Sequence, residues 1–307
     1  MWFKNIFSRS AAAEQPLFDE AFLRRVERLS LQAQPTLRGR PAGGEHLSRN
    51  QLPATIFSDH RPYSPGDDYR HVDWNAYAHQ DEVFVRLGEI EQSVNVHLLL
   101  DVSRSMAWGE PPKLRAAQRL VAALGYLALA HHDRLRVTPF GEAPLAGFGP
   151  AQGKARLFDM LGFVERARAD QPTALADALA GYARQHSHGG LLIVCSDLLA
   201  PDGLERGLAA LPPPRWQVLV LHLLDPRELS GAVAAGPVEL EDAETGQRLP
   251  LLLDAATLAE YRRAVRAWQE RVAAACARCG ATYAQIPADW PIERQALPYL
   301  RARRMLR

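Results

Sequence analysis

Residues 98–106 read LLLDVSRSM, an apolar run that ends in the carboxylate of Asp101 and is followed by the hydroxyls of Ser103 and Ser105. A short apolar run that stops at a polar residue is typical of a strand buried on both faces of a parallel sheet. Ligands of doubly wound sheets bind at the carboxyl ends of the strands, where loops and helix N-termini converge. The stretch therefore predicts a buried strand that carries three oxygen-bearing side chains to a ligand-binding edge.

Outward from this stretch, short apolar runs alternate with amphipathic segments to the end of the chain. We predict strands at residues 94–100, 135–140, 191–195, 216–223 and 282–286, and helices at residues 114–131, 154–167, 175–186, 203–210, 258–279 and from 292 onward. Such alternation is typical of a mostly parallel, Rossmann-like sheet with helices on both faces. Residues 228–253 interrupt it, because Glu244-Thr245-Gly246 lies between two alternating segments and predicts a β-hairpin insertion.

The segment before this α/β pattern has a different character. Residues 18–33 have the apolar spacing of a helix, and a polar, aromatic-rich region follows in which residues 82–87 alternate like a strand. We therefore expect an N-terminal subdomain over residues 1–92 and the α/β domain over residues 93–307.

Composition narrows the choice of partner and compartment. The 36 lysines and arginines nearly balance the 35 aspartates and glutamates, so no basic field favours a nucleic acid. Three cysteines make no disulfide framework, which fits a reducing compartment. No apolar run approaches the roughly 18 residues of a membrane span, and residues 1–13 lack the core of a signal peptide. We expect a cytoplasmic protein without a transmembrane segment.

The oxygen-bearing residues at the predicted edge suit a metal ion. Asp101, Ser103 and Ser105 supply a carboxylate and two hydroxyls, and Thr173 and Asp197 add two further oxygens near the ends of neighbouring elements. Hard cations take oxygen ligands, and such a set fits Mg²⁺, with Mn²⁺ or Ca²⁺ as alternatives, better than zinc. The competing interpretation of the Asp-x-Ser-x-Ser segment alone is a helix-capping turn.

These five residues resemble the metal-ion-dependent adhesion site of von Willebrand factor A domains. The resemblance implies a von Willebrand factor A-like fold, with the N-terminal extension and the hairpin as additions. It also implies that an acidic side chain of a partner protein fills the open position of the metal. The family often has glycine before the threonine, whereas this chain has Pro172 before Thr173, so Thr173 is the least secure of the expected ligands.

A second resemblance covers nearly the whole chain. The stretch from residue 59 to residue 74, together with the hairpin at residues 241–248 and the helix that contains Tyr261, is similar to the bacterial domain-of-unknown-function 58 family. The residues that carry the signature are Arg61, Pro62, Tyr63, Pro65, Gly66, Asp67, Asp68, Arg70, Asp73 and Trp74. Members are usually encoded beside a MoxR-type AAA+ ATPase. The resemblance therefore implies an adaptor or chaperone-like partner of that ATPase, with other von Willebrand factor A proteins as further partners.

The role of the signature has two interpretations. In the first, Arg61, Arg70 and Asp73 belong to a buried ion-pair network that would hold the N-terminal subdomain against the sheet. In the second, the same region is a direct partner-binding surface. The first is the more common use of such charges.

Enzymatic functions find little support in the sequence. No G-x-x-x-x-G-K-[ST] or G-x-G-x-x-G motif follows a predicted strand, and no catalytic triad can be assembled. A Mg²⁺-dependent phosphohydrolase is the enzyme alternative, because acidic residues at strand ends also hold metal in such enzymes. The site has hydroxyls where those enzymes use more carboxylates, so we expect a non-enzymatic protein.

Overall fold

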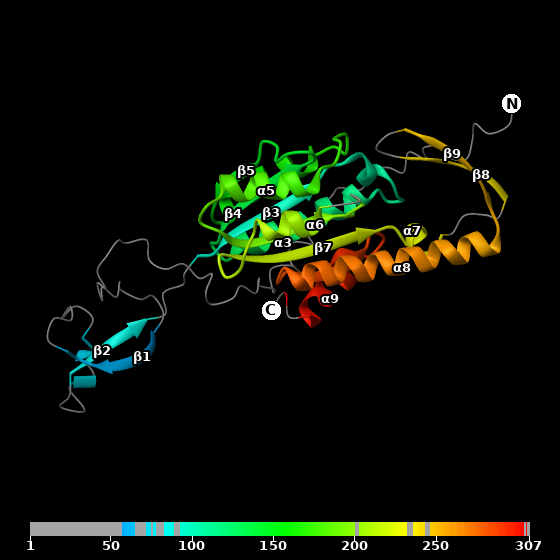
Figure 1. The fold of residues 1–307 in the computed structure, drawn as a ribbon. Coiled ribbons are helices and arrows are strands. Elements are labelled where there is room, and N and C mark those ends of the chain that lie inside the picture. The colour runs from blue at the N-terminus through cyan, green and yellow to red at the C-terminus, as the bar shows by residue number, and fades with distance from the viewer. Residues whose placement is uncertain are drawn as a thin grey trace. The chain divides into compact units, whose positions relative to one another are not determined.

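The computed structural model describes residues 57–64, 72–74, 76–77, 83–88, 93–199, 203–231, 236–242, 246–303 and 305 (Figure 1). The chain divides into one compact unit within residues 38–93 and a second that contains residues 94–307. Each unit is described by itself. The helix predicted at residues 18–33 lies outside the described residues.

The larger unit is built on a six-stranded sheet of order β10-β7-β6-β3-β4-β5. Its parallel strands are β3 (Asn95–Asp101), β4 (Arg134–Phe140), β6 (Gly190–Ser196), β7 (Trp216–Leu224) and β10 (Thr282–Pro287). The edge strand β5 (Phe148–Ala151) pairs antiparallel with β4. The mostly parallel sheet predicted from the sequence is thereby confirmed. The strand β5 was not predicted, because its four residues include glycine and proline and have no alternation.

Helices cover both faces of this sheet. One layer contains α3 (Lys113–Ala130), α4 (Leu157–Glu165), η5 (Ile292–Ala296) and α9 (Leu297–Ala302), and the other contains α5 (Leu175–Gln185), α6 (Leu204–Ala209) and α8 (Ala255–Arg278). Leu98 and Leu100 pack into the first layer and Leu99 into the second, because successive side chains of a strand point to opposite faces. Both faces being covered explains the continuous apolar run of β3.

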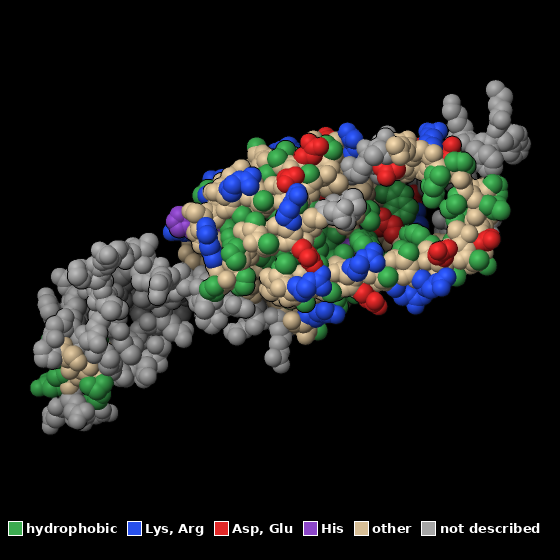
Figure 2. All heavy atoms as spheres, in the orientation of Figure 1, with side chains coloured by type: hydrophobic (Ala, Val, Ile, Leu, Met, Phe, Trp, Pro, Cys, Tyr) green, Lys and Arg blue, Asp and Glu red, His purple; other side chains and the backbone are tan. Residues whose placement is uncertain are grey.

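Shorter segments complete the unit. They are η3 (Arg104–Ala107), η4 (Lys154–Arg156) and α7 (Pro226–Ser230). The antiparallel hairpin of β8 (Gly236–Glu241) and β9 (Arg248–Leu253) lies in the segment for which an insertion was predicted. Figure 2 shows hydrophobic side chains on its surface, and Leu240, Leu249 and Leu252 are exposed. Within the described part of the chain, no helix combines the length and hydropathy that a membrane span requires.

The smaller unit contains an antiparallel pair, β1 (Phe57–Pro62) and β2 (Phe84–Gly88), and an isolated bridge joins Val72 to Val85. Asp73 is buried, and its Oδ1 accepts a hydrogen bond from the backbone N–H of Ala76 at 3.1 Å. Trp74 is exposed. The signature residues Pro65, Gly66, Asp67, Asp68 and Arg70 lie outside the described residues.

A buried histidine in the centre of the sheet makes stability depend on pH. His97 of β3 lies with Nδ1 2.7 Å from the Tyr182 hydroxyl. Burial, with His186 and Arg136 nearby, lowers the pKa of His97 from 6.5 to about 3. The native state therefore favours the neutral ring. Its contribution to stability is complete above pH 6.5 and is lost as the pH falls from 6.5 towards 3.

As the pH falls through this range, we expect protonation of His97 alone to lower the free energy of unfolding by at most about 1.4 kcal/mol per pH unit. Urea unfolding at several pH values should show a shallower decline for His97→Gln than for the wild type. The matched control is His188→Gln at an exposed position. Equal slopes for the wild type and His97→Gln would contradict the prediction.

Candidate functional site

The turn that follows β3 gathers the predicted oxygen atoms. Asp101 is the last residue of β3, and its Oδ1 accepts a hydrogen bond from the backbone N–H of Ser103 at 2.9 Å. The hydroxyl oxygens of Ser103 and Ser105 lie 3.1 Å apart. All three side chains are buried, and Asp101 is only 2% exposed. Three oxygen-bearing groups thus meet within five residues at the carboxyl end of the central strand.

The neighbouring strand adds a fourth group that the sequence prediction did not include. Ser196 ends β6, which pairs in parallel with β3, so its side chain reaches Asp101 across the sheet. The hydroxyl of Ser196 donates to Oδ2 of Asp101, and the backbone N–H of Leu198 donates to the same hydroxyl oxygen at 3.0 Å. Ser196 directly precedes the predicted ligand Asp197 in the sequence, but it was not itself among the predicted ligands.

Asp197 takes part in a buried ion-pair chain. The ammonium of Lys113, the first residue of α3, lies 2.8 Å from Oδ2 of Asp197 and also pairs with Oε1 of Glu228. Lys113 is 0% exposed and Asp197 2%. The sequence prediction missed Lys113 and Glu228. One available signal was a lysine at a helix N-terminus, where the helix dipole disfavours positive charge.

The electrostatics of the site follow from this burial. Burial, together with the negative charge of Asp197, raises the pKa of Asp101 to about 7. The hydrogen bonds from Ser196 and Ser103 act in the opposite direction and lower this pKa. Burial by itself would lower the pKa of Lys113, but the pairs with Asp197 and Glu228 raise it. Lys113 thus compensates Asp197 from one side, and a second cation beside Asp101 would be electrostatically favourable.

The segment that precedes Thr173 lies beside the turn after β3. The backbone N–H of Arg104 donates to the carbonyl of Gln171 at 2.9 Å, and the N–H of Gln171 donates to the carbonyl of Val102 at 3.1 Å. An isolated parallel bridge also joins Ser103 to Gln171. The chain two residues before Thr173 therefore runs beside the serine turn.

The side-chain oxygens of Asp101, Ser103 and Ser105 are ligands of the kind that a hard divalent cation takes. Neighbouring ligands in an octahedral Mg²⁺ shell with bonds near 2.1 Å lie about 3 Å apart. The separation of 3.1 Å between the hydroxyl oxygens of Ser103 and Ser105 matches that spacing. Within the described ranges, no three His, Cys, Asp or Glu side chains gather in a way that could hold a metal. A metal here would depend on hydroxyls as well as carboxylates, which suits magnesium and not zinc.

Glu228 lies on the short helix α7, from which its side chain contacts Lys113. Asp225 caps its N-terminus and forms a capping box with Glu228, which is the Asp-x-x-Glu pattern at a helix start. The guanidinium of Arg227 pairs with Asp225 and lies 4.9 Å from the ring centroid of Trp108. Trp108 is 40% exposed. An aromatic surface with a neighbouring cation therefore lies next to the buried ion pairs.

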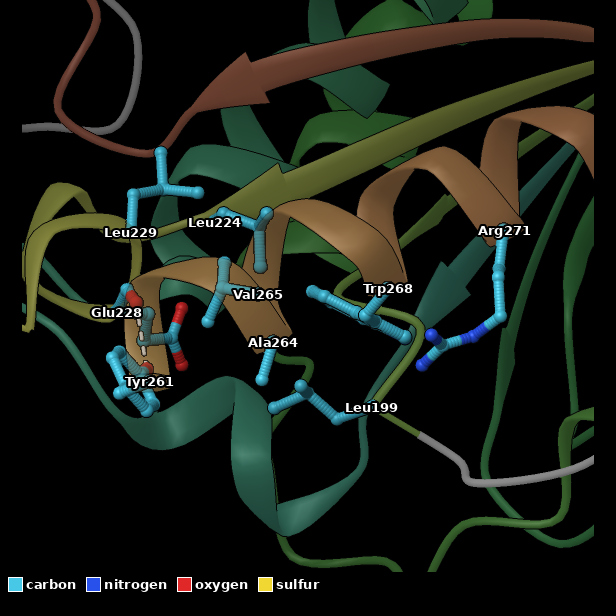
Figure 3. Close-up of a pocket in the computed structure, with 9 residues that line it drawn as sticks. All are labelled: Leu199, Leu224, Glu228, Leu229, Tyr261, Ala264, Val265, Trp268 and Arg271. Atoms are coloured by element: carbon cyan, nitrogen blue, oxygen red, sulfur yellow. Dashed lines mark hydrogen bonds between the residues drawn. The ribbon is translucent and has the colours of Figure 1, made fainter. Parts of the chain in front are cut away.

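A cavity of about 440 Å³ adjoins these ion pairs (Figure 3). Its walls include Leu199, Leu224, Leu229, Val265 and Trp268, and the polar Arg271. Glu228 also lines it, and the hydroxyl of Tyr261 donates to the carbonyl of Glu228 at 2.6 Å. The cavity thus lies between the end of β7, α7 and α8.

Comparisons with known proteins give a family match without a characterised function. A family model described as "Protein of unknown function DUF58" matches residues 59–271. Uncharacterized proteins of Mycobacterium tuberculosis and Mycobacterium bovis are each 29% identical over 255 residues, which is 80% of this chain and 78% of each relative. An uncharacterized protein of Mycobacterium avium is 32% identical over 115 residues, which is 38% of this chain and 67% of that protein.

Solved structures give a weaker likeness. The conserved hypothetical protein BatB from Bacteroides thetaiotaomicron has a TM-score of 0.44 and 19% identity, over 69% of this chain and 98% of that chain. An aerotolerance-related membrane protein from Bacteroides fragilis, with multiple mutations to serines, has the same score and identity over 68% of this chain and 98% of that chain.

Proposed function

The chain belongs to the DUF58 family, as its signature predicted, and we propose that it is a non-enzymatic, metal-dependent protein-interaction module whose partner is a MoxR-type AAA+ ATPase. The observation that carries the proposal is the buried cluster of Asp101, Ser103 and Ser105 at the end of β3. Its position at the carboxyl edge of a mostly parallel sheet supports a von Willebrand factor A-like domain.

In this proposal Asp101, Ser103 and Ser105 hold Mg²⁺, and Thr173 and Asp197 complete its shell directly or through water. When bound, the ion supplies an open coordination position for a carboxylate of the partner. Ser196 and the backbone of Ser103 orient the Asp101 carboxylate, and Lys113 compensates the charge of Asp197. The chain's own residues thus fix the ligand oxygens before the partner arrives.

Binding is better supported than catalysis by the groups around the cluster. A hydrolase would need a general base near the metal. His222 contacts the carbonyl of Asp197 through Nε2 and the Tyr283 hydroxyl through Nδ1, and burial lowers its pKa to about 4. Both ring nitrogens are engaged inside the domain, and Lys113 is engaged in ion pairs. These contacts favour an interaction module over the phosphohydrolase alternative.

The cytoplasm is the compartment that we propose for this interaction. Cys195, Cys276 and Cys279 are free thiols, and Cys195 is buried in the strand β6. Unpaired cysteines are typical of a reducing environment.

The test is capture of the MoxR-type ATPase of the same organism by the full chain, with Mg²⁺ or with EDTA. We expect capture in Mg²⁺, and its loss both in EDTA and with Asp101→Ala. Asp159→Ala, at an exposed aspartate of α4, is the matched control and should bind like the wild type. Equal capture in EDTA would reject the metal bridge, and no capture in Mg²⁺ would reject the ATPase as partner.

A further inference from the structure

The cavity between β7, α7 and α8 has the character of a binding pocket. Cavities of roughly 300–1,000 Å³ with apolar walls and a few polar groups are typical of ligand sites. This one measures about 440 Å³, and Leu199, Val265 and Trp268 provide apolar walls (Figure 3). Leu199 is 45% exposed, so part of this apolar wall faces solvent. Apolar surface is therefore available to a partner here.

Two connections join this pocket to the Asp101 cluster. The backbone N–H of Leu199 donates to Oδ1 of Asp197 at 3.2 Å, so the pocket wall begins two residues after Asp197. Glu228 lines the pocket and pairs with Lys113, which also pairs with Asp197. Leu199 and Glu228 of the pocket wall are therefore both connected to Asp197, one through a direct hydrogen bond and the other through Lys113.

The charges around the pocket favour an acidic occupant. The helix α8, which forms one wall, contains five arginines and two glutamates. Arg271 lines the pocket, and Glu228, which also lines it, shares the ammonium of Lys113 with Asp197. A divalent ion beside Asp101 would add further positive charge. The apolar walls and the basic surroundings together favour a ligand that has both an acidic and an apolar side chain.

We infer that the pocket and the Asp101 cluster form one bipartite docking surface for a partner segment in which an acidic residue lies a few positions from a bulky apolar residue. The carboxylate binds at the cluster, and the apolar side chain enters the pocket between Leu199, Val265 and Trp268. The inference rests on the proposed function, and it adds a second recognition element that gives the metal site its specificity. A metal–carboxylate contact alone would accept any exposed acidic side chain.

The test begins with a displayed library of random linear peptides selected on the immobilised full chain in Mg²⁺. The expected consensus pairs Asp or Glu with Leu, Ile, Phe or Trp a few positions away. A synthetic consensus peptide is then titrated by fluorescence anisotropy against the wild type, Leu199→Asp and Val265→Asp. Burial of one large apolar side chain predicts a loss of affinity of about 10- to 100-fold in both variants. The control is Phe158→Asp, which changes an exposed residue of α4 and should bind like the wild type.

The outcomes distinguish a failure of this inference from a failure of the proposed function. A Mg²⁺-dependent consensus without an apolar position, or unchanged affinity in both pocket variants, would overturn the bipartite surface and leave the metal bridge standing. Selection of the same peptides in EDTA would overturn the metal bridge and this inference with it. Dimerisation in light scattering that Leu199→Asp abolishes would assign the pocket to a second copy of the chain and overturn the inference. Thermal unfolding of both variants shows that loss of binding is not loss of fold.

Discussion

Replacing Lys113 with methionine should lower the free energy of unfolding by about 3–5 kcal/mol, the cost of removing one partner from a buried ion pair. Its ammonium is fully buried between the carboxylates of Asp197 and Glu228, which are 2% and 19% exposed. Methionine keeps the length and the packing of the side chain but removes the charge. Two carboxylates then remain in a poorly solvated place without a cation. Urea unfolding of the full chain in EDTA measures the loss.

Two further variants identify the cause of that loss. Lys154→Met, at an exposed lysine, should change stability by less than about 0.5 kcal/mol. Adding Asp197→Asn and Glu228→Gln to Lys113→Met should recover much of the lost stability. All three side chains are then uncharged, so no buried carboxylate is left without a compensating cation. A loss below about 1 kcal/mol for Lys113→Met would show that the carboxylates are neutralised or hydrated without it.

The central sheet could be predicted from the sequence because its signal is local. The three leucines of residues 98–100 are buried on alternate faces, so a continuous apolar run is what such a strand requires. Boundaries were less accurate where a cap decides them. The helix α8 begins at Ala255 and not at residue 258, because the side chain of Asp254 accepts a hydrogen bond from the N–H of Thr257 at 2.7 Å.

The candidate site likewise has a part that could be predicted from the sequence and a part that could not. Asp101, Ser103 and Ser105 lie within five residues, so their proximity could be predicted from the strand and turn alone. Lys113 and Glu228 are 115 positions apart, and only the fold brings α3 and α7 together. The capping box that begins at Asp225 was readable in the sequence, but it predicts only a helix start. The direction of the Glu228 side chain is a tertiary property.

Replacing Asp101 with asparagine should abolish stabilisation by Mg²⁺ and leave the metal-free protein at least as stable as the wild type. Asparagine nearly preserves the shape, and its amide oxygen can still accept from the Ser103 N–H. It also removes a charge that burial and Asp197 disfavour, which is why the pKa of Asp101 is raised to about 7. A residue kept at such a cost is expected to serve binding and not stability.

Urea unfolding above pH 7, with EDTA or with Mg²⁺, separates the two effects. If Asp101 is a ligand, Mg²⁺ at 100 times its dissociation constant should stabilise the wild type by about 2.7 kcal/mol and Asp101→Asn by almost nothing. The exposed control Asp159→Asn should respond to Mg²⁺ like the wild type. Equal stabilisation of the Asp101 variant would remove Asp101 from the metal shell. A loss of about 2 kcal/mol or more in EDTA would instead make Asp101 a structural residue, whose hydrogen bonds with Ser103 and Ser196 hold the turn after β3.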